Sequence, residues 1–163
     1  MSAEQPELAP RNPTILVAYD GSDNARRAVQ RAGELFPGCT TLVVTAWMGV
    51  ADTAPELLLA PGGVLFATVG VLSDTMKERA TEVSAEGARL ATEAGLVAEA
   101  RAVHSRHAMW EGLLRCAHES DARVIVVGSR GHAAIVAAVL GSVSTGVLHH
   151  STRPVLVVPT EEG

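Results

Sequence analysis

Three glycines and a serine near the end of the chain have the residue types and spacing of a phosphate-binding loop. Two residues separate Gly128 from Gly131, and nine more separate Gly131 from the pair Gly141-Ser142. Glycine lets a backbone approach a phosphate closely, and the free N–H groups at a helix start carry roughly half a positive charge. Taken singly, each glycine is more often a simple turn and Gly141-Ser142 an ordinary helix cap. The joint spacing after a strand and before a helix predicts an anion-binding loop.

Residues that accelerate phosphoryl transfer are scarce around this loop. The chain has no G-x-x-x-x-G-K-[ST] motif and no G-x-G-x-x-G motif after a strand, and its one lysine, Lys77, falls in the middle of a predicted helix. Phosphoryl transfer requires Mg²⁺ ligands, a charge-stabilising Lys or Arg and a residue that positions water. The sequence offers only Asp20, Arg130 and Ser142 for these roles. We therefore expect binding rather than rapid turnover.

Four apolar runs and one imperfectly alternating segment, all separated by helical patterns, must position the loop. The predicted strands cover residues 14–19, 41–46, 96–104, 124–127 and 155–158, and the predicted helices cover residues 25–35, 73–95, 109–117 and 143–150. Unbroken apolar strands that alternate with helices are typical of a parallel sheet covered on both faces. We therefore expect an α/β fold with an open five-stranded parallel sheet. Ligands of such sheets bind beyond the carboxyl ends of the strands.

Two segments fall outside this pattern. Residues 1–13 hold three of the eight prolines and no apolar periodicity, which predicts a disordered arm. Residues 47–72 mix Gly, Pro and aliphatic residues, which predicts an apolar insert that serves as a lid or a partner surface; the long helix after it is expected to be capped by Ser73. Residues 14–160 are long enough for one domain.

Composition argues against several partners. Thirteen basic residues against eighteen acidic ones give a net charge of −5, whereas nucleic-acid binding rests on clustered Lys and Arg. The N-terminus lacks the basic and apolar regions of a secretory signal. The longest uncharged apolar stretch, residues 57–72, is interrupted by Pro61-Gly62-Gly63 and is shorter than the ~20 residues of a membrane helix. We expect a cytoplasmic protein that binds neither nucleic acid nor membranes.

Three motifs together resemble the universal stress protein family over about residues 14–159. They are I-L-V-A-Y-D-G-S from Ile15 to Ser22, the spacing Gly128-x2-Gly131-x9-Gly141-Ser142, and R-P-V-L-V-V-P from Arg153 to Pro159. The resemblance implies a five-stranded parallel sheet of order 3-2-1-4-5 in one nucleotide-binding domain, commonly dimeric. Because the glycine motif is complete, the resemblance also implies binding of ATP, with or without Mg²⁺.

The same resemblance assigns parts of the nucleotide to individual residues. The adenine and ribose would lie against Ala18, Asp20 and Ala46, the ribose would lie above Val127 and Gly128, and the phosphates would be held by Gly131, Gly141, Ser142, Val143 and Ser144. An alternative role for Asp20 is to cap the following helix. The pairs His104/His107 and His149/His150 lack a converging third ligand, so we expect no metal site, and His149 and His150 are expected at a helix C-terminus.

The sequence thus predicts a stress-response protein that binds ATP or a related adenine nucleotide. A slow ATPase and an interaction module with a vestigial nucleotide site are the alternatives, and the intact glycine motif argues against the second. We also expect a homodimer through Val155 to Val158, because an apolar edge strand without lysine presents unpaired N–H and C=O groups. Alternatively, the C-terminal tail or the 47–72 insert covers that edge.

Overall fold

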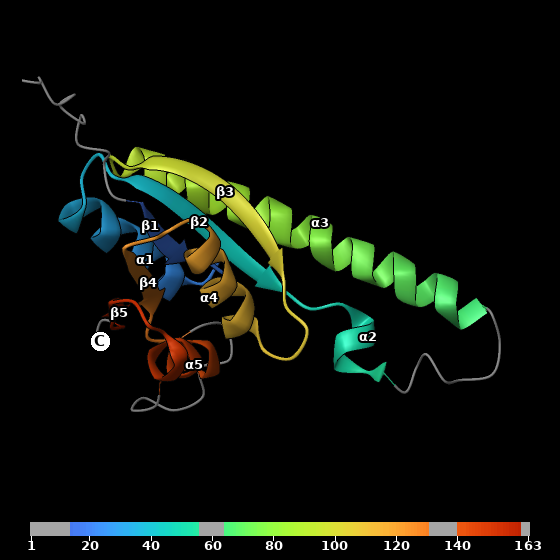
Figure 1. Ribbon diagram of the computed structural model, residues 1–163. Helices are drawn as coiled ribbons and strands as arrows, with labels where there is room; N and C mark the ends of the chain where they lie inside the picture. The colour runs from blue at the N-terminus through green and yellow to red at the C-terminus, as the bar shows by residue number, and fades with distance from the viewer. Residues whose placement is uncertain (1–13, 56–63, 131–139, 161–163) are drawn as a thin grey trace, which may run out of the picture.

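The computed structural model describes residues 14–55, 64–130 and 140–160 (Figure 1). The predicted disordered arm, the central part of the predicted insert and Gly131 lie outside these ranges.

Five parallel strands form one sheet in the order β3-β2-β1-β4-β5, which confirms the predicted fold. The strands are β1 (Ile15–Ala18), β2 (Thr40–Trp47), β3 (Val97–His104), β4 (Val124–Gly128) and β5 (Val155–Val158). Strand β1 is central, with Ile15 opposite Thr41 of β2 and Val124 of β4. The chain moves outward from β1 first through β2 and β3, then through β4 and β5. The winding therefore reverses between β1 and β4, which is where open α/β sheets bind ligands.

Helices cover both faces of the sheet. One face packs against α1 (Asp23–Leu35) and α3 (Val64–Glu93), and the other against α4 (Met109–Glu119) and α5 (Ser142–His150). Side chains alternate along each strand, so Val17 belongs to the first core and Leu16 to the second, and both are fully buried. The apolar runs that predicted buried strands therefore supply side chains to both cores.

Helix α3 differs from the sequence prediction. It begins at Val64 rather than at a Ser73 cap, and its first half extends past the ends of β2 and β3 beside the short helix α2 (Val50–Thr53) (Figure 1). A helix grows by adding backbone hydrogen bonds to an existing turn, and a one-sided apolar pattern is not required for that growth. None of the helices in the described ranges is both long and apolar enough to cross a membrane.

Candidate functional site

The chain beyond β4 is held against the start of α5. The three residues Gly128, Ser129 and Arg130, here called the β4 junction, lead away from the strand. The N–H group of Ser129 donates to Val158 C=O at 2.7 Å, and its C=O group accepts from the N–H of Gly141 at 2.8 Å. The Ser144 hydroxyl donates to Gly128 C=O at 2.6 Å. The structure therefore brings Gly128, Gly141 and Ser144 together.

Among the described residues, no side chain caps the first N–H groups of helix α5. Gly141 is the N-cap residue, with φ −63° and ψ 156°, and it makes no side-chain capping bond; the first turn carries no acidic residue. Free first-turn N–H groups and the positive end of the helix dipole stabilise a bound anion. The backbone at the start of α5 therefore fits a phosphate group.

Four of the predicted apolar site residues lie on the α4/α5 face of the sheet, close to its carboxyl edge. Val127 is buried in the second core, and Ala18, Ala46 and Val143 pack against this core and stay half-buried. Ala18 is the last residue of β1, whose pairing partner Val44 precedes Ala46 by two positions in β2. Two of the four, Ala18 and Ala46, carry short side chains near the strand ends.

Asp20 and Ser22 organise the turn between β1 and α1. The carboxylate of Asp20 accepts the N–H of Ser22 at 3.0 Å, and the Ser22 hydroxyl accepts the N–H of Ala25 at 3.2 Å. Ser22 is therefore the N-cap of α1, and Asp20 supports the turn one step earlier rather than capping the helix directly. The side chain of Asp20 is exposed beside the carboxyl end of β1.

One residue near the site gave no signal in the sequence. Asn24, in the first turn of α1, is buried, and its Nδ2 donates to Arg130 C=O at 2.9 Å and to the Ser129 hydroxyl at 3.4 Å. The two segments are more than 100 positions apart in the chain. An asparagine after a Ser-Asp pair is ordinary at a helix start, so no local pattern could reveal this contact.

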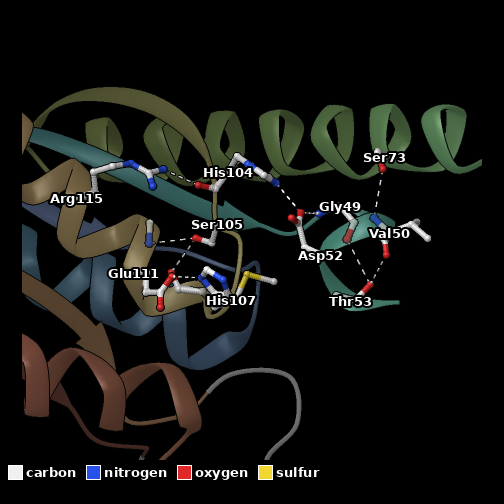
Figure 2. Close-up of polar contacts among 12 residues, drawn as sticks. Gly49, Val50, Asp52, Thr53, Ser73, His104, Ser105, His107, Glu111 and Arg115 are labelled. Carbon is white, nitrogen blue, oxygen red and sulfur yellow. Dashed lines mark hydrogen bonds and ion pairs between the residues drawn. The ribbon is translucent and has the colours of Figure 1, made fainter. Parts of the chain in front are cut away.

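A second polar cluster lies at the carboxyl ends of β2 and β3 (Figure 2). His104 Nε2 lies 2.6 Å from Asp52 Oδ2, which also accepts the N–H of Gly49 at 2.8 Å. Burial raises the pKa of Asp52, but the hydrogen bonds from His104 and Gly49 and the charges of His104 and Arg106 together hold that pKa below its usual value. The N–H of Val50 donates to the Ser73 hydroxyl at 3.2 Å. This cluster therefore attaches α2 to β3 and α3.

The remaining histidines that the structure describes lie in or beside helices α4 and α5. His107 Nδ1 lies 3.4 Å from Glu111, and His149 and His150 occupy the last turn of α5, as predicted. The ring of His150 stacks on Trp110 of α4, with centroids 4.3 Å apart and planes 9° apart. Within residues 14–55, 64–130 and 140–160, no three His, Cys, Asp or Glu side chains gather as a metal site would require.

Comparisons with known proteins agree with this architecture. The sequence model of the universal stress protein family matches residues 12–159. A Thermus aquaticus protein, "Universal stress protein in QAH/OAS sulfhydrylase 3'region", is 36% identical over 151 residues, which cover 89% of this chain and 97% of that protein.

Solved structures show the same fold. The hypothetical protein MJ0577 superposes with a TM-score of 0.75 at 19% identity, covering 94% of this chain and 99% of that chain. A universal stress protein crystallised in complex with cAMP superposes with a TM-score of 0.64 at 28% identity, covering 93% of this chain and 99% of that chain. Sequence and fold agree along nearly the whole chain, which therefore belongs to the universal stress protein family.

Proposed function

We propose that this protein binds an adenine nucleotide at the carboxyl edge of β1 and β4, with the phosphates at the start of α5. The observation that carries the proposal is the uncapped first turn of α5, joined to the β4 junction through the bond between Gly141 and Ser129. A relative of 28% identity holds cAMP, which supports an adenine nucleotide as the ligand. Anion binding by backbone groups requires no lysine, which suits a chain with only one.

The residues of the site divide by chemistry. We assign the adenine and ribose to Ala18, Asp20 and Ala46, and the underside of the ribose to Val127 and Gly128. The phosphate-binding set is Gly131, Gly141, Ser142, Val143 and Ser144. The Ser144 hydroxyl already donates to Gly128 C=O, so Ser144 would offer a phosphate its backbone N–H, whereas the exposed Ser142 can offer both N–H and hydroxyl.

The finer identity of the ligand and the assembly follow as parts of the same proposal. The ligand is ATP, with or without Mg²⁺, bound by a cytoplasmic stress-response protein whose residues 14–160 act as one domain. The homodimer forms through β5, since this strand is the edge of the sheet beyond β4. In Val157→Lys a charge at the contact would weaken the dimer, and light scattering measures that change; a monomeric wild-type protein would overturn the dimer.

Calorimetric titration with ATP, cAMP and adenosine, each with and without Mg²⁺, tests the binding site. The decisive pair of variants is Gly141→Asp and Gly141→Asn, because the φ and ψ of Gly141 suit either residue and both side chains cap a helix. Asn competes with a phosphate for the N–H groups, and Asp adds charge repulsion. We expect Asp to weaken ATP binding more than about tenfold relative to Asn. A wild-type protein that binds none of these ligands, or equal ATP affinities for the two variants, would contradict the assignment.

A further inference from the structure

We propose that Asn24 is a positioning residue of the nucleotide site, which holds the β4 junction against α1 so that it faces the start of α5. The inference rests on the proposed function. No phosphate contact is assigned to Asn24 itself. It acts through the junction that it binds.

The Asn24 amide crosses from α1 to the β4 junction. Its side chain is largely removed from solvent, with 8% of the residue exposed, and its Nδ2 is bonded to Arg130 C=O at 2.9 Å and to the Ser129 hydroxyl at 3.4 Å. Buried amides make stronger and better directed bonds than exposed ones, because water does not compete for their partners. The position of the junction is therefore tied to the first turn of α1.

Gly128 shows how closely the junction rests on Asn24. A Cβ at position 128 would lie 2.8 Å from Asn24 Nδ2 and 3.1 Å from both its Cγ and its main-chain oxygen. Side-chain and main-chain atoms of Asn24 thus form the surface against which the end of β4 is seated. Any side chain at position 128 would push the junction away from α1.

Ser129 connects Asn24 to the start of α5, where we place the phosphates. Its hydroxyl accepts from Asn24, its N–H donates to Val158 C=O, and its C=O accepts the N–H of Gly141, the N-cap of α5. One residue therefore connects α1, β5 and α5. A shift of the Ser129 backbone changes where Gly141 begins the helix, and the binding of a phosphate depends on that position.

The other end of the Asn24 amide is unsatisfied. Asn24 Oδ1 is buried and has no hydrogen-bond partner among the described residues. A side chain that served only to fill space would be expected to be apolar, because an unpaired buried acceptor is unfavourable. An asparagine at this position therefore indicates a polar role, which the bonds of its Nδ2 to the β4 junction supply.

Calorimetry with ATP and adenosine separates positioning from general destabilisation. Asn24→Leu keeps the side-chain shape and removes both polar ends; Asn24→Ala is the second variant in case Leu disturbs folding. Ser22→Ala is the matched control, since it removes the cap of the same helix and leaves the Asn24 bonds in place. We expect the Asn24 variants to bind ATP at least about tenfold more weakly and to lose clearly less affinity for adenosine, which meets the junction only at Gly128 beneath the ribose. We expect Ser22→Ala to bind both ligands normally.

Each alternative outcome decides the matter. Equal losses for ATP and adenosine, unchanged ATP affinity in folded Asn24 variants, or the same ATP loss in Ser22→Ala would overturn the positioning role while leaving nucleotide binding intact. A wild-type protein that binds neither ligand would overturn the proposed function and this inference together.

Discussion

Helices α1 and α5 both start at the carboxyl edge of the sheet, yet their first turns are satisfied in different ways. In α1, the Ser22 hydroxyl accepts the N–H of Ala25, and Asp23 adds a negative charge to the first turn. In α5, Gly141 provides no side chain and no acidic residue follows. The dipole of α1 is therefore balanced by the chain itself, whereas no described side chain caps α5. This difference is why we propose the start of α5, and not that of α1, as the phosphate site.

The two faces of the sheet also differ in how far their aromatic side chains are buried and hydrogen-bonded. On the α1/α3 face the ring of Tyr19 is buried against Gly87, and its hydroxyl donates to Glu86 at 2.8 Å. On the α4/α5 face Trp110 packs against Gly146 and stays half-buried, stacked on an exposed His150. The first aromatic contact is closed and hydrogen-bonded, whereas the second lies at the surface beside the helix that would bind the ligand. Substitutions on the two faces should therefore affect stability and binding differently.

Gly87→Val should have the largest effect. A Cβ at position 87 would lie 2.6 Å from Tyr19 Cδ1 and 2.8 Å from Val43 Cγ1, and neither buried side chain has room to move. We expect the free energy of unfolding to fall by about 3 kcal/mol in a denaturant titration. Gly70→Val is the matched control in the same helix, because no atom lies within 4 Å of its Cβ position. Because valine is a better helix former than glycine, Gly70→Val should lose no stability, and equal losses in the two variants would show that the Tyr19 contact does not set the cost.

Gly146→Ala should come next and should affect both stability and binding. Its Cβ would lie 2.1 Å from Trp110 Cδ1, so the indole must leave its place on α5. We expect a loss of about 2 kcal/mol in unfolding free energy, with weaker ATP binding because α5 shifts. Gly87→Ala, on the opposite face, is the control: its stability should fall and its ATP affinity should stay unchanged. Normal ATP binding by a folded Gly146→Ala protein would break the proposed link between α5 packing and the site.

Removing the cap of α1 and adding one to α5 tests the comparison of the two helix starts directly. Ser22→Ala should lower the unfolding free energy by about 1 kcal/mol, and Gly141→Ser should change it by only a few tenths of a kcal/mol. For ATP affinity the order should be reversed. Ser22→Ala should bind ATP normally, and Gly141→Ser should bind it more weakly because its hydroxyl would compete for the N–H groups. Calorimetry on both variants measures this. Stronger ATP binding by Gly141→Ser would mean that the hydroxyl contacts the nucleotide instead of competing with it.

The sequence predicts the sheet well because most buried parallel strands appear in it as runs of consecutive apolar residues. Strands β1, β2, β4 and β5 contain apolar runs, and Gly128 ends one of them, whereas β3 alternates imperfectly. The first half of α3 shows no comparable pattern, since residues before Ser73 lack one-sided periodicity and the helix there extends beyond the sheet. The bonds of Asn24 to the β4 junction and of His104 to Asp52 join segments far apart in the chain. Local patterns carry no information about such pairs, and a folded structure is needed to find them.

The smallest predicted effect is the pH dependence of stability caused by Tyr19 on the α1/α3 face, which does not appear at neutral pH. Burial, followed by the hydrogen bond and charge of Glu86, raises the pKa of Tyr19 to about 12. Because the folded pKa exceeds the unfolded value of about 10, the stabilisation from Tyr19 is complete below pH ~10 and is lost as the pH rises towards 12. Tyr19 is the only tyrosine, so the ultraviolet absorbance of phenolate reports this one group.

Glu86→Gln sharpens that measurement. Replacing the carboxylate removes a negative charge and a strong acceptor from the Tyr19 hydroxyl, so the pKa of Tyr19 should fall while burial keeps it above 10. ATP affinity should stay unchanged, since Glu86 lies on α3, on the face opposite α5. A wild-type Tyr19 that titrates near 10 would mean that the α1/α3 face is open to water. The proposed difference between the α1/α3 face and the α4/α5 face would then fail, because the aromatic contacts on both faces would be exposed to solvent.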